Sequence, residues 1–189
     1  MNARAFRLVV FAQICLYAGV LLAVLLKPQG LAANSGISYY GIYARTIIPM
    51  ATGLLSAAFL SWRAALYIER QDLRPIKYGL AAFAILTVVI VVTPYSFDGI
   101  ADDLHTTAGS MLFSLQLLLS IWMIVKLHYK SLAIFLTLVE LGAGIACAYY
   151  LHPAHGLLIQ FQLLFQLAFG LLLVYSIAKL KVTDKAVLP

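Results

Sequence analysis

The chain has 189 residues, of which 63% are hydrophobic and only 11% are charged, and it carries a formal net charge of +6 at pH 7. Soluble domains are closer to half apolar and a quarter charged, so a soluble protein of this size could not bury so much apolar surface. Disorder is excluded too, because disordered chains combine low hydrophobicity with high net charge. The composition therefore predicts an integral membrane protein whose partners are membrane lipids. Its positive charge is expected to contact anionic lipid, and no nucleic-acid binding is predicted.

Six apolar runs of membrane-spanning length follow one another along the chain. A bilayer core of about 30 Å needs about 20 helical residues at a rise of 1.5 Å per residue. The runs are continuously apolar, unlike the alternating ten-residue segments of a membrane β-barrel. The sequence therefore predicts an all-α fold, a single transmembrane domain (residues 1–189) built as a bundle of six helices. The expected helices cover residues 8–26, 46–68, 78–97, 104–127, 131–150 and 155–179.

The first run follows two arginines, Arg4 and Arg7, in the manner of a signal peptide. Its apolar core, Leu8–Leu26, has 19 residues. Signal-peptide cores are shorter, at about 7–15 residues. We therefore expect this run to remain as the first helix of the bundle.

Lysine and arginine are divided unevenly between the two ends of the predicted bundle. Of the 13 such residues, only Lys27 and Arg45 fall at one end, and the other eleven fall at the end that carries both chain termini. Loops rich in lysine and arginine stay in the cytoplasm. The sequence therefore predicts cytoplasmic N- and C-termini and an outer end that carries few positive charges.

Polar side chains inside the spans need an explanation, because a charged acid near the bilayer centre costs about 2.5–3.5 kcal/mol on the insertion scale. Glu140 lies nine residues into its span, about 14 Å along the helix axis. Gln116 and Gln166 each lie about 15 Å below the outer interface. We therefore expect the three residues to form a polar layer at one level of the bundle, which Thr87 and Ser56 could extend.

Two interpretations of this layer stay open. In the first, the three side chains form hydrogen bonds between helices, each worth about 0.6 kcal/mol, that hold the bundle together. In the second, Glu140 lines a relay for protons or for a substrate, because ionisable groups inside membranes mark such pathways. The low polarity of the site favours the neutral form of the acid.

A second polar group is expected at the outer end, in the links before the fourth and sixth spans. It consists of Asp98, Asp102, Asp103, His105, His152 and His155. Imidazole and carboxylate groups suit zinc or another divalent metal. The candidate ligands are His105, His152, His155 and Asp102. The spacing matches no recognised metal motif, so no cofactor is predicted, and the alternative is that Asp102 and Asp103 cap a helix.

Small residues recur at a spacing of four within two of the spans. Gly53 and Ala57 form one such pair, and Gly142 and Ala146 form another. This spacing places both members on one face of a helix and allows a second helix to approach closely. We therefore expect both pairs to lie at helix contacts.

Two segments carry a resemblance to a known family. They are the loop Asn34–Tyr40 and the stretch Thr93–Asp98, which is followed by His105. Through them the chain resembles a bacterial family of six-helix integral membrane proteins of unknown function, which is distantly similar to DRAM-like membrane proteins. The resemblance implies a location in the bacterial plasma membrane and a polar outer mouth that includes Asp98 and His105. It supplies no reaction.

A second resemblance, to the seven-helix metal-dependent lipid hydrolases that include alkaline ceramidases, rests on scattered aspartate and histidine residues near one membrane face. The sequence contains neither a nucleotide-binding loop nor a hydrolase elbow or zinc-protease motif. Our leading interpretation is therefore a non-enzymatic protein that binds or transports a lipid or small solute through an outward-facing polar cavity. The alternatives are an intramembrane metal-dependent lipid hydrolase and an accessory subunit that docks a membrane partner or a second copy of itself.

Overall fold

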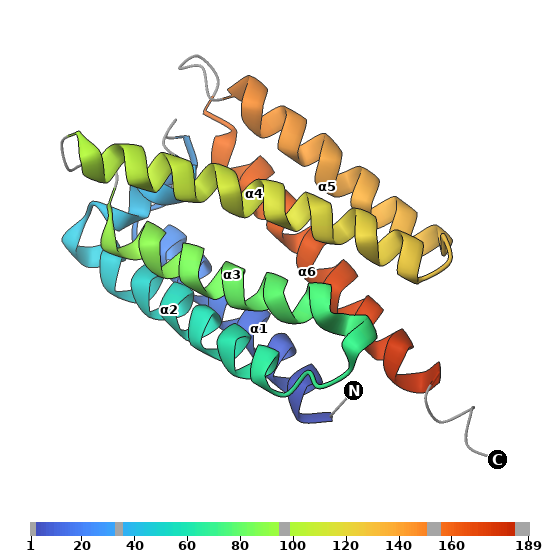
Figure 1. Cartoon of the computed structure of the whole chain (residues 1–189). Coiled ribbons are helices and arrows are strands. Elements are labelled where there is room, and N and C mark those ends of the chain that lie inside the picture. Colours follow the sequence, from blue (N-terminus) through green and yellow to red (C-terminus); the bar gives the residue numbers. More distant parts are fainter. Residues whose placement is uncertain (1–2, 33–35, 95–98, 151–155, 184–189) are drawn as a thin grey trace.

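The computed structural model of the chain describes residues 3–32, 36–94, 99–150 and 156–183 (Figure 1). Within these ranges the chain is helical and contains no strand. The α-helices are α1 (Ala3–Leu26), α2 (Ala44–Leu66), α3 (Arg74–Val92), α4 (Ile100–Lys126), α5 (Ser131–Tyr150) and α6 (Leu158–Thr183). Short 3₁₀ helices lie in the links: η1 (Pro28–Ala32), η2 (Gly36–Gly41) and η3 (Gln71–Leu73). All six α-helices are long and apolar enough to cross a membrane, which confirms the all-α prediction at this level.

The helices alternate in direction, so the bundle has two ends. At the η2 end, α1, α3 and α5 finish and α2, α4 and α6 begin; at the η3 end, α1 begins and α6 finishes (Figure 1). Neighbouring helices along the chain pack together, and α6 also contacts α1 and α4. In α6, 50% of the most apolar window is buried, against 33% in each of the other five helices. It is therefore the central helix of the bundle.

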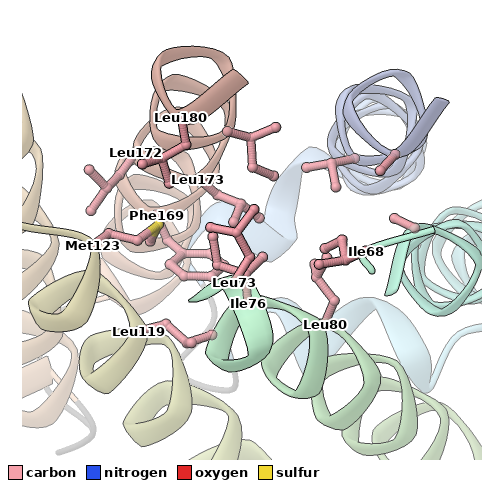
Figure 2. Close-up of a cluster of buried hydrophobic side chains, with 14 of the residues drawn as sticks. Ile68, Leu73, Ile76, Leu80, Leu119, Met123, Phe169, Leu172, Leu173 and Leu180 are labelled. Atoms are coloured by element: carbon pink, nitrogen blue, oxygen red, sulfur yellow. The ribbon is translucent and has the colours of Figure 1, made fainter. Parts of the chain in front are cut away.

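An apolar core fills the η3 half of the bundle. Phe169, Leu172 and Leu173 of α6 pack with Met123 of α4 and Ile76 of α3, and all five are at most 3% exposed (Figure 2). Small residues at the start of α1 and the end of α2 complete the same cluster. Lipid tails are as apolar as these side chains, so this core stabilises the bundle through close packing rather than through burial from water. It fills the interior of the η3 half, whereas cavities of about 110 and 80 Å³ lie toward η2.

Glycines of α1 and α2 let the backbones of these two helices approach closely. An ideal Cβ atom at Gly19 would lie 2.7 Å from the Cα of Gly53 and 2.7 Å from the carbonyl oxygen of Pro49. The predicted contact at Gly53 is therefore confirmed. The same expectation for Gly142 is wrong within the described residues: Gly142 is exposed, and no atom of a neighbouring element lies within 4 Å of an ideal Cβ there.

The third helix differs from the prediction at both ends, and backbone chemistry explains why. The third helix ends at Val92 rather than at residue 97, because a residue before proline disfavours the helical conformation and Pro94 follows. It begins at Arg74 rather than at residue 78, with a proline in its first turn, where no amide donor is needed. The early end of α3 leaves the Thr93 carbonyl beyond the helix, where α4 can reach it.

Candidate functional site

His105 lies in the second turn of α4 and is held between two other parts of the chain. Its Nδ1 atom lies 2.6 Å from the carbonyl oxygen of Thr93 and 3.2 Å from that of Ile90, at the end of α3. Its Nε2 atom lies 2.8 Å from the hydroxyl oxygen of Ser38 in η2. A carbonyl oxygen can only accept, so Nδ1 carries the proton and Nε2 of the neutral ring accepts from the Ser38 hydroxyl. The ring is 8% exposed and its tautomer is set by these partners.

A cavity of about 110 Å³ lies beneath this pair, and residues from α1, α2, α3, α4, α6 and η2 line it. Its walls are mainly apolar, from side chains such as Leu16, Phe83 and Leu112. Polar groups lie at its two ends: Ser38, His105 and Gln162 line it near η2, and Thr87 and Gln166 line it deeper. An adjoining cavity of about 80 Å³ shares Ser38 and His105 and extends between α2 and α3.

The η2 segment that carries Ser38 is fixed from α6. The Ile37 amide donates to Oε1 of Gln162 at 2.7 Å. Gly36 has a φ of +58°, a conformation that favours glycine, and the Gln162 side chain occupies the space where a Cβ atom would lie. The Thr46 hydroxyl also donates to the carbonyl of Tyr40 at 2.7 Å. These contacts set the position of the Ser38 hydroxyl against His105.

The two glutamines predicted for the polar layer pair with each other. The Gln116 side-chain amide donates to Oε1 of Gln166 at 2.8 Å, and the Gln166 amide donates back to Oε1 of Gln116 at 3.0 Å. Both side chains are buried, at 0% and 7% exposure. An amide is self-complementary, since it offers a donor and an acceptor to a second amide. The pair therefore needs no acid, and it joins α4 to α6 at the floor of the cavity.

Glu140 makes a separate contact. It is fully buried on α5, and its Oε2 atom accepts from the Ser120 hydroxyl of α4 at 2.5 Å. Its Oε1 atom is also buried and has no hydrogen-bond partner among the described residues. Ser120 lies one helical turn beyond Gln116, so the acid sits beside the amide pair along α4 instead of within it.

The residues predicted for the outer mouth are only partly described. Asp102 and Asp103 lie in the first turn of α4, where carboxylates favour the positive end of the helix dipole, but the N-cap residue is Gly99. The other three residues named for this site, Asp98, His152 and His155, lie outside the described residues. In the part of the chain that the structure describes, no three histidine, cysteine, aspartate or glutamate side chains come together as metal ligands.

Three residues of this region were not predicted from the sequence to belong to the site: Ser38, Ser120 and Gln162. For two of them a signal existed. Gln162 lies four residues before Gln166, and Ser120 lies four residues after Gln116, so each shares a helix face with a residue that was identified. Ser38 lies in a loop, where no periodicity indicates which way a side chain points.

Comparison with known proteins adds no identity to this geometry. No family model, curated protein or solved structure matches the chain. The features that bear on function are therefore the cavity and the residues around it.

Proposed function

We propose that this chain is an integral protein of a bacterial plasma membrane that binds a small amphiphile in the cavity beneath His105. The observation that carries the proposal is the cavity itself: about 110 Å³ of mainly apolar space with hydrogen-bonding groups at both ends. The bacterial location is supported by the resemblance of the loop around Ser38 and of the segment before His105. The cavity is required both for binding alone and for binding as one step of transport.

The lining selects the chemistry of the ligand. Among the described residues that line the two cavities, none is a lysine, arginine, aspartate or glutamate, so a charged ligand would find no counter-charge there. An apolar cavity of about 150 Å³ accommodates benzene, so this one fits a chain of only a few carbons. Ser38, His105 and Gln162 offer donors and acceptors to one polar end. The favoured ligand is neutral, with a short apolar chain and one hydrogen-bonding group.

Access to the site is expected from the side of the bundle. The smaller cavity is lined by Ile47 of α2 and Val91 of α3, which are both partly exposed. These residues lie on neighbouring helices near the η2 end. An amphiphile dissolved in the bilayer could therefore enter between α2 and α3 without leaving the lipid.

Filling the cavity should abolish binding without unfolding the protein. Gly109 lines the cavity one turn beyond His105, and no atom of a neighbouring element lies within 4 Å of an ideal Cβ there. We expect Gly109→Leu to reduce photolabelling of the cavity by 3-azibutanol by about tenfold or more, which corresponds to a loss of about 1.4 kcal/mol of binding free energy. Labelled peptides from α3 and α4 are quantified by mass spectrometry.

Gly142→Leu is the matched control, because Gly142 also has open space at its Cβ position but is exposed on α5, which is not among the elements lining the cavity. It should leave the labelling of α3 and α4 unchanged. Equal labelling in all three proteins, or no label in the wild-type cavity, would contradict the proposed binding site.

The second part of the proposal is the orientation, with both termini in the cytoplasm. It is supported by the distribution of charge, since eleven of the 13 lysines and arginines belong to the end where α1 begins and α6 finishes. The exposed positions Gln29 and Lys130 lie at opposite ends of the bundle.

In a variant that lacks the two native cysteines, Gln29→Cys should react with a membrane-impermeant maleimide in intact cells. Lys130→Cys should react only after the membrane is permeabilised. Labelling of a gel band is the measurement, and the reverse pattern would overturn the orientation.

A further inference from the structure

The contact between Ser38 and His105 has the geometry of an activated nucleophile. A serine hydroxyl attacks a carbonyl carbon effectively only when a base within about 2.6–3.2 Å accepts its proton and a third group orients that base. The hydroxyl oxygen of Ser38 lies 2.8 Å from Nε2 of His105. The carbonyl oxygen of Thr93 lies 2.6 Å from Nδ1 and holds the ring in the tautomer whose Nε2 is a hydrogen-bond acceptor. All three parts of the arrangement are therefore present.

The contacts of His105 Nδ1 can be explained by structure alone, whereas the contact of Nε2 with Ser38 cannot. Carbonyls in the last turn of a helix lack partners within the helix, and His105 supplies a donor to the two at the end of α3. That role occupies Nδ1 alone. The opposite nitrogen is then directed at a hydroxyl that lines the ligand cavity.

Gln162 supplies a donor for the charge that such an attack creates. Its Oε1 atom is occupied by the Ile37 amide at 2.7 Å, which fixes the orientation of the side-chain amide. Its NH₂ group has no hydrogen-bond partner among the described residues, and Gln162 lines the same cavity as Ser38 and His105. Side-chain amides are among the donors that stabilise the oxyanion of an acyl-transfer intermediate.

We propose that Ser38 and His105 hydrolyse a neutral carboxylic ester of the amphiphile that the cavity binds, an inference that rests on the proposed ligand site. The Ser38 oxygen forms a bond to the acyl carbon while its proton passes to Nε2 of His105. The ester C–O bond then breaks, and the leaving alcohol takes that proton. A water molecule next gives a proton to Nε2 and its oxygen to the acyl carbon, and the Ser38–acyl bond breaks as the proton returns to Ser38. The products are a carboxylic acid and an alcohol.

The two cavities divide the substrate between them. The larger one, with Leu16, Phe83 and Leu112 in its walls, has a volume of about 110 Å³ and room for an acyl chain of about four carbons. The smaller one, between α2 and α3, receives the alcohol portion. The substrate class is therefore a short-chain acyl ester that partitions into the membrane.

The test uses a fluorophosphonate probe, which bonds covalently to activated serines, on the full chain in lipid nanodiscs. The wild type should gain the mass of one probe on Ser38 and should hydrolyse ethyl butyrate, with the released butyric acid measured by gas chromatography. Ser38→Ala should abolish both signals, whereas Ser114→Ala, at an exposed serine of α4, should preserve both. His105→Asn keeps a side-chain amide donor for the Thr93 carbonyl but lacks the base. It should therefore keep the melting temperature while the labelling rate falls by about 10²-fold or more.

Photolabelling of the cavity by 3-azibutanol separates the two proposals. Ser38→Ala should still be photolabelled, because the cavity remains. If the wild type is photolabelled but neither bonds the fluorophosphonate nor cleaves the ester, the hydrolytic proposal is overturned and ligand binding stands. If labelling by the fluorophosphonate occurs at another serine, or survives in His105→Asn at the wild-type rate, the pairing of Ser38 with His105 is structural only. If the wild type is not photolabelled, the ligand site itself is wrong.

Discussion

Replacing Gly19 with valine should destabilise the bundle more than any other single substitution described above. An ideal Cβ atom at Gly19 would lie 2.7 Å from both the Cα of Gly53 and the carbonyl oxygen of Pro49. These neighbours are backbone atoms, so no side chain can rotate away, and α1 would have to separate from α2. Overpacking costs about 1–3 kcal/mol where side chains can adjust, and we expect the free energy of unfolding to fall by about 3 kcal/mol or more here. Unfolding in mixed micelles by titration with SDS measures it.

Gly142→Val provides the control for this prediction. It introduces the same side chain into a transmembrane helix, so its effects on helix propensity and apolar area are the same. The new side chain enters open space, whereas at Gly19 it meets the backbone of α2. The free energy of unfolding should change by no more than about 0.5 kcal/mol. Equal losses for the two variants would show that valine itself, and not the contact between α1 and α2, is responsible.

The helices could be predicted from the sequence because the bilayer imposes its thickness on local composition. Backbone N–H and C=O groups in lipid must form hydrogen bonds within the segment that crosses it, which favours helices. Each span can therefore be recognised in the sequence as an apolar run of the required length. The end of the third helix was predicted wrongly because a proline inside the apolar run stops the helix. The apolar run of the third helix continues past Pro94, but the helix stops at Val92.

The faces of the helices could not be predicted in the same way. Side chains that face lipid and side chains that face the bundle are equally apolar, so composition does not distinguish them. Leu136 and Leu138 of α5 are two residues apart, and they are 8% and 61% exposed. The two glycine–alanine pairs have the same spacing in the sequence, so spacing did not distinguish them either. The rotation of each helix about its axis places Gly53 against α1 and leaves Gly142 facing outward.

In the candidate site, too, the depth of a residue could be predicted from the sequence, but its contact partner could not. Depth along a helix follows from its rise per residue, so Gln116 and Gln166 could be assigned to one level, and they do pair. The choice of partner depends on rotation, so the contact of Glu140 with Ser120 was missed. The approach of Ser38 to His105 depends on how η2 folds against α4 and α6, which involves residues 67 positions apart in the chain.

Replacing Glu140 with leucine should make the insertion of α5 much more favourable. An acidic residue near the centre of a span costs about 2.5–3.5 kcal/mol on the insertion scale, whereas leucine contributes about −0.3 to −0.6 kcal/mol. The insertion free energy should therefore improve by about 3 kcal/mol, roughly a hundredfold in the equilibrium. The measurement is the inserted fraction of residues 131–150 in a glycosylation-mapping assay. Glu140→Gln, which keeps a polar side chain, should improve insertion less.

The folded bundle should tolerate Glu140→Leu without losing stability. Comparing this result with the gain in insertion tests why an acid is present at this position. Glu140 makes one hydrogen bond, from Ser120, and its second oxygen is buried without a partner among the described residues. Such a bond between membrane helices is worth about 0.6 kcal/mol, and the Ser120 hydroxyl can turn to the carbonyl of Gln116 four residues earlier. We expect Glu140→Leu to be at least as resistant to SDS as the wild type. An acid that hinders insertion and adds no stability is then best explained by a relay through the membrane. A marked loss of resistance to SDS would instead assign Glu140 the structural role of holding α5 against α4.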